Sequence, residues 1–159
     1  MEVKSRHHLR SDEIDALCSA IESGLGVEIE GDSFEFVELE DDAFDLVLID
    51  GDPLACYIHD EPFLTVAGAN AFPPESGLVT VDAGAVSFVS NGADVMRPGI
   101  VEADGSIEPG DLLAIEEETH GKVLAIGRAL VAGSAMLGDS GKVVESIHHV
   151  GDELYNVSL

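Results

Sequence analysis

The residues best suited to binding chemistry lie between Val79 and Gly99, in the run VTVDAGAVSFVSNGADVMRPG. Gly84 and Gly92 leave the backbone open near both ends of a short apolar segment. Arg97 is one of only seven Lys and Arg residues in the chain. Because exposed backbone beside a cation suits phosphate, the run predicts a surface for a phosphate-bearing ligand.

The elements that position these residues follow from local start and stop signals. A β-branched segment predicts a strand that passes through Asp82 into a short apolar helix. Asn91-Gly92 ends that helix, and an extended segment then runs to Pro98-Gly99. Strand, helix, turn and strand are therefore expected within this single run.

The formal net charge is −25, from 32 acidic and 7 basic residues, although 45% of the residues are apolar. This charge argues at first against nucleic acid, because phosphate binding requires cations. The regular strand and turn patterns do not fit an acidic disordered tail. A folded, acidic chain is typical of the cytoplasm of a salt-accumulating halophile, where molar salt screens repulsion beyond about 3 Å. The acidity then reflects the solvent rather than the ligand.

The acidic residues are unevenly distributed along the chain. Residues 1–76 contain 19 acidic and 3 basic residues, whereas residues 77–159 contain 13 and 4. Between Val79 and Gly99 the only charged residues are Asp82, Asp94 and Arg97. A nearly uncharged stretch in so acidic a chain is a candidate for a surface that faces an anion.

The first half of the chain predicts one helix and an antiparallel meander. Residues 4–10 contain the only basic cluster, which fits either a solvated arm or a nucleic-acid-binding arm. Ser11 can cap a helix with apolar residues at helical spacing, and Gly24 or Gly26 can end it. Asp50-Gly51-Asp52 predicts a hairpin turn rather than a calcium loop. Alternating apolar residues predict strands at 27–30, 34–39, 44–50 and 54–60.

The best linker candidate is AGANAFPPESG, residues 67–77, because glycine and a Pro-Pro pair interrupt every period there. It predicts two domains, residues 1–76 and 77–159. Beyond Gly99, short strands and turns predict a small barrel or closed sheet. The C-terminal segment predicts two extended pieces around Gly151-Asp152.

Four segments of the second half together resemble the PUA domain, named for pseudouridine synthases and archaeosine transglycosylases. They are VDAGAVSFVSNGADVMRPGIV, EPGDLLAI, KVLAIGRALV and VVESIHHVGDELY. The first half, through KSRHHLRSDEI and IDGDPLACYIHDEPFLT, is similar to the small domain that precedes PUA in some proteins. These are the translation factors ligatin and malignant T-cell amplified sequence, and their archaeal stand-alone relatives.

The resemblance implies an α+β protein. A small N-terminal pre-PUA-like domain of helix and antiparallel sheet would precede a mixed β pseudobarrel that binds RNA without catalysis. In PUA domains RNA docks against the first helix and the strand after it. Carried over to this chain, the resemblance nominates as RNA-binding residues Gly84, Asn91, Gly92, Arg97, Pro98 and Gly99, with Arg128 and His148 as further candidates.

Structural roles remain open for several of these residues. Gly92 can simply close a helix, and Pro98-Gly99 can shape a turn. Arg97 can form a salt bridge with a carboxylate instead of contacting RNA. Of the adjacent His148 and His149, strand alternation predicts one in the core and one exposed.

The sequence lacks a nucleophile elbow, a phosphate loop, zinc-ligand spacing and a CxxC motif, so we expect no enzymatic activity, cofactor or metal site. We expect a cytoplasmic protein without a membrane anchor that binds tRNA or small-subunit rRNA in translation initiation or ribosome recycling. The small ribosomal subunit and an initiation-factor-like protein are candidate partners. Two alternatives stay open, an accessory RNA-binding subunit of a tRNA-modifying enzyme and an acidic protein-interaction module that does not bind RNA.

Overall fold

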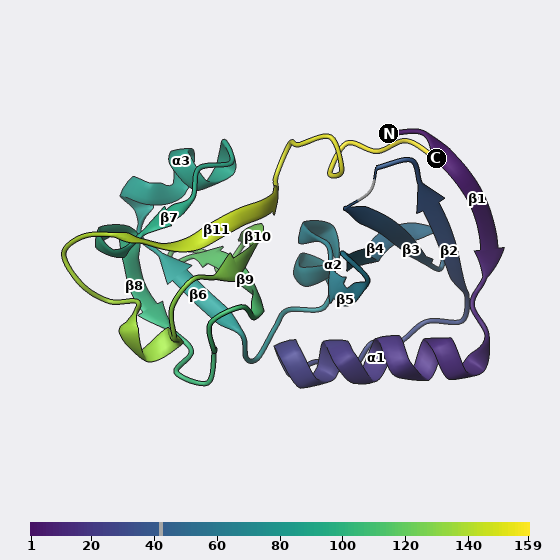
Figure 1. The fold of residues 1–159 in the computed structure, drawn as a ribbon, viewed down its shortest axis with the longest axis horizontal. Coiled ribbons are helices and arrows are strands. Elements are labelled where there is room, and N and C mark those ends of the chain that lie inside the picture. The colour runs from purple at the N-terminus through teal and green to yellow at the C-terminus, as the bar shows by residue number, and fades with distance from the viewer. Residues whose placement is uncertain (42) are drawn as a thin grey trace.

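The computed structural model of the chain describes residues 1–41 and 43–159. A five-stranded antiparallel sheet, sheet A, lies on the right in Figure 1. Its strands pair in sequence order, so each hydrogen-bonds to the next along the chain. They are β1 (Val3–His8), β2 (Phe34–Leu39), β3 (Phe44–Ile49), β4 (Asp52–Ile58) and β5 (Glu61–Leu64).

Helix α1 (Ser11–Leu25) packs on sheet A through the buried residues Leu17, Ile21 and Leu25. The prediction that Ser11 caps it is wrong by one residue, because Arg10 is the N-cap and its N–H donates to Oε1 of Glu13 at 2.9 Å. The helix ends at Gly26 (φ 68°), as one of the two predicted glycines. In the described part of the chain, no helix has the length and apolar character needed to cross a membrane.

Sheet A differs from the prediction at its first strand. Residues 27–30 form no strand, and the basic cluster predicted as an arm instead contributes β1, which pairs with β2. Arg6 Nη2 lies 2.7 Å from Glu35 Oε1, so part of the cluster's charge is neutralised within the sheet. The predicted hairpin at Asp50-Gly51 is confirmed, with φ of 52° and 91° as a type I′ turn requires. Residue 42, before β3, lies outside the described residues.

A short helix, α2 (Val66–Ala71), stands where the sequence predicted the start of a linker. The side chain of Thr65 caps it by accepting the N–H of Gly68 at 3.0 Å. The α-carbon of Gly68 faces the Leu54 carbonyl so closely that a β-carbon would collide with it. The side-chain amide of Asn70 bonds the backbone of Val123 in both directions, at 3.0 and 2.9 Å. Helix α2 thus ties sheet A to the second sheet.

Sheet B has the strand order β7-β11-β10-β9-β6-β8. Strands β6 and β9 run parallel and the other pairs are antiparallel, so the sheet is mixed. Its two outer strands, β7 and β8, are joined only by the 3-10 helix Arg97–Gly99, and the sheet curls into a nearly closed barrel (Figure 1). The strands are β6 (Leu78–Val81), β7 (Val95–Met96), β8 (Ile100–Ala103), β9 (Leu112–Glu117), β10 (Val123–Ala129) and β11 (Lys142–His149).

This architecture confirms the expected α+β class, a helix with an antiparallel sheet followed by a mixed β pseudobarrel. One detail of the C-terminus is wrong. β11 is extended as predicted, but residues 151–156 after it form turns rather than a second extended piece. In Figure 1 this segment carries the C-terminus back across sheet A to the N-terminus, and the amino group of Met1 lies 3.0 Å from Glu153 Oε1.

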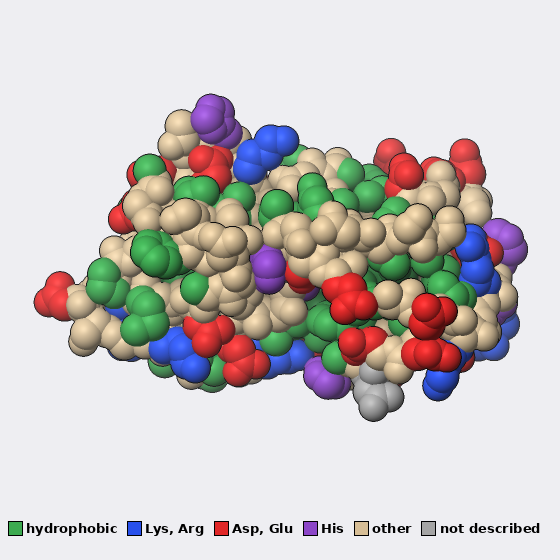
Figure 2. All heavy atoms as spheres, turned by 90° about the horizontal axis from the view of Figure 1, so that it is seen from above, with side chains coloured by type: hydrophobic (Ala, Val, Ile, Leu, Met, Phe, Trp, Pro, Cys, Tyr) green, Lys and Arg blue, Asp and Glu red, His purple; other side chains and the backbone are tan. Residues whose placement is uncertain are grey.

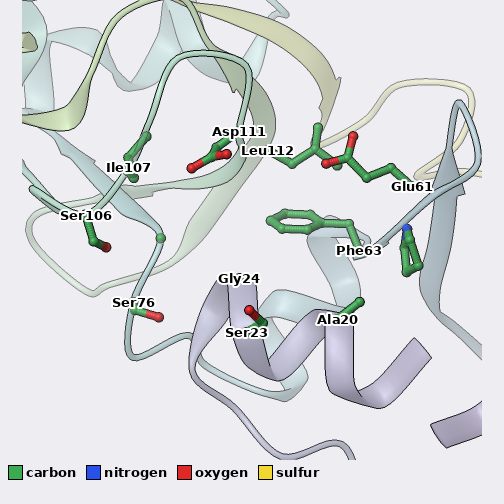
Figure 3. A pocket seen from close by; sticks show the side chains of 12 residues that line it. Ala20, Ser23, Gly24, Glu61, Phe63, Ser76, Ser106, Ile107, Asp111 and Leu112 are labelled. Atoms are coloured by element: carbon green, nitrogen blue, oxygen red, sulfur yellow. The ribbon is translucent and has the colours of Figure 1, made fainter. Parts of the chain in front are cut away.

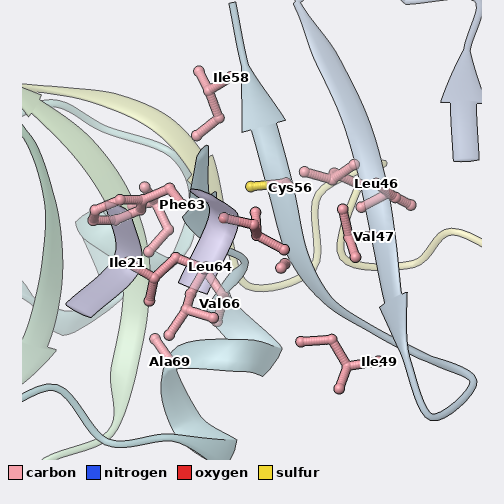
Figure 4. Packing of buried hydrophobic residues seen from close by; sticks show 14 of the residues in the cluster. Ile21, Leu46, Val47, Ile49, Cys56, Ile58, Phe63, Leu64, Val66 and Ala69 are labelled. Carbon is pink, nitrogen blue, oxygen red and sulfur yellow. The ribbon is translucent and has the colours of Figure 1, made fainter. Parts of the chain in front are cut away.

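Buried apolar residues form two clusters. One fills the barrel and includes Val79, Ile115 and Val144. The other packs α1 and α2 against sheet A, and Figure 4 shows Ile21, Phe63 and other members converging there. That second cluster also contains residues from beyond position 77, namely Leu112, Ala114, Val123, Ile126 and Leu154. The division at residues 76 and 77 therefore stays a prediction, and the two sheets share part of one core.

Candidate nucleic-acid interface

The chain leaves β6 and forms two short helices at one end of the barrel. Oδ1 of Asp82 accepts the N–H of Ala85 at 3.0 Å and caps the 3-10 helix Ala83–Ala85. Helix α3 (Val86–Ser90) follows and ends at Asn91, whose Nδ2 donates to the Ser87 carbonyl at 2.7 Å. The strand, helix and turn predicted between Val79 and Asn91 are therefore present.

A groove separates α3 from the 3-10 helix Arg97–Gly99. The Gly99 carbonyl accepts the N–H of Asp82 at 2.9 Å, which fixes this second helix beside the end of β6. The groove has a volume of about 450 Å³ and a mainly apolar lining. We call it the α3 groove, and its lining consists of Asp82, Gly84, Ala85, Phe88, Val89, Ala93, Asp94, Val95, Met96, Pro98 and Gly99.

Two large apolar side chains of the α3 groove are exposed to solvent. Phe88 is 66% exposed and Met96 is 49% exposed. Figure 2 views the molecule from above, and hydrophobic side chains gather at its left end, over the barrel. Val89 is buried, whereas the neighbouring Phe88 of α3 faces solvent. An exposed aromatic ring beside glycine backbone can stack on a planar ligand.

Gly92 adopts a φ of 88°, which closes α3 as the structural alternative predicted. It also lies against a side chain, because a β-carbon here would sit 2.7 Å from Nε2 of His149. Nδ1 of His149 lies 3.1 Å from the Ser90 carbonyl and 2.9 Å from the Val150 carbonyl, and therefore carries the proton. The half-buried imidazole of His149 therefore packs against the turn at residues 91 and 92 and stabilises it.

Arg97 has a role that neither sequence alternative anticipated. Its Nε donates to the Ala135 carbonyl at 2.9 Å and its Nη1 to the Ser140 carbonyl at 3.0 Å. Among the described residues it forms no ion pair within 4.0 Å. Arg97 lies between β7 and β8, the two outer strands of sheet B, and we call the place where these strands meet the seam of the barrel. The two hydrogen bonds of Arg97 hold the loop after β10 across this seam.

Arg128 and His148 lie away from the α3 groove. Arg128 Nη1 is 3.1 Å from Glu61 Oε2 in β5 and donates to the Gly110 carbonyl at 2.8 Å. His148 is 1% exposed, and its Nε2 accepts the N–H of Val66 at 3.1 Å. Its Nδ1 therefore donates to Asp152, at 2.9 Å from Oδ2. Both side chains connect the barrel to other elements. The strand prediction is met in part, because His148 is buried but His149 is half-buried rather than exposed.

The charges around the α3 groove are few. Its lining contributes Asp82 and Asp94, and Nζ of Lys142 on β11 lies 3.4 Å from Asp94 Oδ2. Phe88, Met96 and Lys142 were not among the site residues predicted from the sequence. For Phe88 the sequence carries no signal of exposure, because adjacent helical residues lie about 100° apart and the barrel can cover either side of a one-turn helix.

A second, smaller cavity of about 270 Å³ lies where α1 and β5 meet the loop before β9 (Figure 3). Its lining includes the hydroxyls of Ser23, Ser76 and Ser106 and the carboxylates of Glu61 and Asp111. None of the nominated RNA-binding residues lines it. Among residues 1–41 and 43–159, no group of three or more His, Cys, Asp or Glu side chains is arranged to hold a metal ion.

Comparison with known proteins gives a consistent result. The family model of the PUA domain matches residues 77–151. The chain is 40% identical over 108 residues to an uncharacterized protein of Methanocaldococcus jannaschii, a match that covers 67% of each chain. It is 32% identical over 117 residues to translation machinery-associated protein 20 of Saccharomyces cerevisiae, covering 69% of this chain and 65% of that protein. The chain thus spans about two thirds of the length of these relatives.

A solved structure shows the same fold. The PUA domain protein from Thermoplasma acidophilum superposes with a TM-score of 0.81 at 30% sequence identity. The match covers 95% of this chain and 97% of that chain, so it includes sheet A as well as the barrel.

Proposed function

This chain belongs to the PUA-domain family, and from that premise we propose that it binds RNA in the α3 groove without catalysing a reaction. The observation that carries the proposal is the exposed ring of Phe88 beside the bare backbone of Gly84 and Gly99. An aromatic face next to glycine backbone allows a base to stack while its ribose approaches closely.

Four nominated residues fit this site by position. Gly84, Pro98 and Gly99 line the groove, and Gly92 sets the turn after α3. Asn91 lies in the same turn, with its Nδ2 donating to Ser87. Arg97 contributes to the site by holding the barrel closed rather than by offering a free guanidinium. Arg128 and His148 are not part of the proposed contact surface.

The biological setting that we propose is translation, with tRNA or small-subunit rRNA as the ligand. The support is the similarity to the yeast protein named for its association with the translation machinery. The small ribosomal subunit and an initiation-factor-like protein are the partners that this setting suggests. Fractionation of native extract would distinguish a role in translation from an accessory role in tRNA modification. Co-migration with a tRNA-modifying enzyme instead of ribosomal subunits would favour the accessory role.

The direct test measures binding of tRNA and small-subunit rRNA in molar KCl by wild type, Phe88→Ala and Tyr155→Ala. Tyr155 is a matched control because it is 45% exposed and lies outside the groove. Base stacking on an aromatic side chain contributes about 1–3 kcal/mol, so Phe88→Ala should weaken binding about 5- to 150-fold. Tyr155→Ala should bind as wild type. Absence of saturable binding to either RNA, or equal affinities of the two variants, would reject the proposed site.

A further inference from the structure

Sheet A has a cavity of its own, with a volume of about 350 Å³. This volume falls within the range of small-ligand sites, about 300–1,000 Å³. None of the nominated RNA-binding residues lines the cavity. We call it the sheet A pocket, and its lining consists of His7, Leu9, Glu13, Phe36, Asp45, Tyr57 and Asp60.

Aromatic rings from three strands line the sheet A pocket. His7 of β1 lies opposite Phe36 of β2, and their ring centroids are 5.1 Å apart. The centroids of Phe36 and Tyr57, which lies on β4, are 5.8 Å apart and their planes are inclined at 64°. Both of these rings are only half-buried. An aromatic lining of this kind attracts a cation that lies over a ring face.

The carboxylates of the sheet A pocket lack positive partners. No Lys or Arg is among the described residues that line it, and in the described chain neither Asp45 nor Asp60 has an ion pair within 4.0 Å. Burial raises the pKa of Asp45, and the charges of Glu38 and Asp60 act in the same direction. The N–H of Leu39 and the charge of Lys4 oppose this shift without cancelling it. A cation entering the pocket would stabilise the ionised carboxylates.

The arginines of the chain do not supply that cation. Arg6 Nη2 lies 2.7 Å from Glu35 Oε1, and Arg10 Nε lies 3.2 Å from Asp12 Oδ1. Arg10 Nε is also 3.8 Å from Oε1 of Glu13, which lines the pocket. Because every arginine already bonds a carboxylate or carbonyl of its own fold, a second copy of this chain is disfavoured as the occupant. These arginines are Arg6, Arg10, Arg97 and Arg128.

We propose that the sheet A pocket binds the guanidinium group of an arginine side chain on a partner protein. A guanidinium is planar, stacks on aromatic faces and binds a carboxylate through two parallel hydrogen bonds. It is more weakly hydrated than the ammonium of lysine, so removing it from water costs less. The methylene stem of arginine can also pack on Leu9 and the rings, which a free ion cannot do. An RNA phosphate would be repelled by the same carboxylates.

Tyrosine fluorescence gives a direct readout of this pocket. The chain contains two tyrosines and no tryptophan, so Tyr155→Phe leaves Tyr57 as the only tyrosine. The whole chain with this substitution is titrated in molar KCl with the capped peptide Gly-Arg-Gly, its lysine and citrulline analogues, and guanidinium chloride. We expect a saturable change in the emission of Tyr57 with the arginine peptide. Citrulline keeps the shape but has no charge, and with two rings involved it should bind about 5- to 30-fold more weakly. The lysine peptide and guanidinium chloride should also bind more weakly than the arginine peptide.

Two variants in the same background test the lining. Asp60→Asn removes an exposed carboxylate at a residue with φ 68°, a conformation that Asn tolerates, and should weaken binding of the arginine peptide about 2- to 5-fold. Asp52→Asn is the matched control, because Asp52 is also exposed on sheet A but lies outside the pocket. It should bind as the parent does. Phe36→Leu should lose about 2- to 5-fold in affinity, with circular dichroism to confirm that it folds.

Several results would overturn the proposal. They are no saturable change with the arginine peptide, equal binding of the citrulline peptide, or equal affinities of Asp60→Asn and Asp52→Asn. Binding of the lysine peptide as tightly as the arginine peptide would exclude guanidinium recognition. Binding of guanidinium chloride as tightly as the peptide would exclude a partner protein as the required source. A change of tRNA affinity in Asp60→Asn but not in Asp52→Asn would place RNA at this pocket instead.

Discussion

Replacing Arg97 by Met should destabilise the barrel, because Met keeps most of the aliphatic length and removes both donors that close the seam. The two lost hydrogen bonds, at 2.9 and 3.0 Å, come from a charged group. Hydrogen bonds of this kind contribute about 1.5–3 kcal/mol each. Because the side chain is half-buried and water can reach the freed carbonyls, we take the lower end and expect a total loss of about 3 kcal/mol.

Thermal unfolding in molar KCl, followed by circular dichroism, measures this loss. A chain of this length loses about 2–4 °C in Tm for each kcal/mol, so Arg97→Met should unfold about 6–12 °C earlier than wild type. The matched control is Arg6→Met, which removes the exposed ion pair with Glu35 at 2.7 Å. Exposed pairs of this kind often contribute nothing measurable, so the control should unfold with wild type.

RNA binding separates the two roles considered for Arg97. If it acts only on the fold, Arg97→Met measured well below its Tm should retain most of its affinity, unlike Phe88→Ala. A variant with unchanged Tm would show that the seam does not depend on this guanidinium. A stable variant that loses RNA affinity as strongly as Phe88→Ala would identify Arg97 as a ligand contact and refute the reasoning.

Three further outcomes are expected. Gly92→Ala should be more destabilising than Gly51→Ala in urea unfolding. Both residues have positive φ, where a side chain costs about 1–2 kcal/mol, but only at Gly92 would the added β-carbon also collide with His149. Equal losses of unfolding free energy would contradict this contact. Hydrogen bonds from backbone N–H groups lower the pKa of Asp104, so its stabilisation is present above about pH 4 and lost as pH falls through the lowered value. The unfolding free energy of Asp104→Asn should fall less steeply than that of wild type in that acid range, and parallel pH profiles would argue against it. Burial raises the pKa of Cys56 to about 12, so this thiol should resist iodoacetamide at pH 8 until denaturant is added, and modification of the folded protein, located by mass spectrometry, would count against its burial.

Most of the elements followed from local patterns in the sequence. The run from Val79 to Gly99 shows this best, since its strand, its short helix and its turn at Gly92 all appear where the start and stop signals place them. The strand prediction at residues 27–30 failed because alternation alone does not supply a neighbouring strand to pair with. The prediction of an arm for the basic cluster was wrong in the opposite way, because these residues pair with β2 and form strand β1.

The site itself stays a prediction, but some residues that line the α3 groove could be named from the sequence. Glycine, proline and asparagine mark backbone geometry locally, so Gly84, Gly92 and Gly99 were identified beside the groove that they shape. The exposure of Phe88 depends on which face of a one-turn helix the barrel covers, and that requires the packed structure. The roles of Arg128 and His148 depend on their contacts with β5 and α2, which only the tertiary structure brings next to them.

By itself the sequence determined the family, the order of most strands and helices, and the location of a nearly uncharged surface in a strongly acidic chain. Those features depend on residues within a few positions of each other or on composition. The tertiary structure decided the partners of polar side chains. Arg97 bonds carbonyls 38 and 43 positions away, and His148 bonds an amide 82 positions away. A hydrogen bond between such distant groups depends on how the strands close the barrel, and no local periodicity encodes that distance.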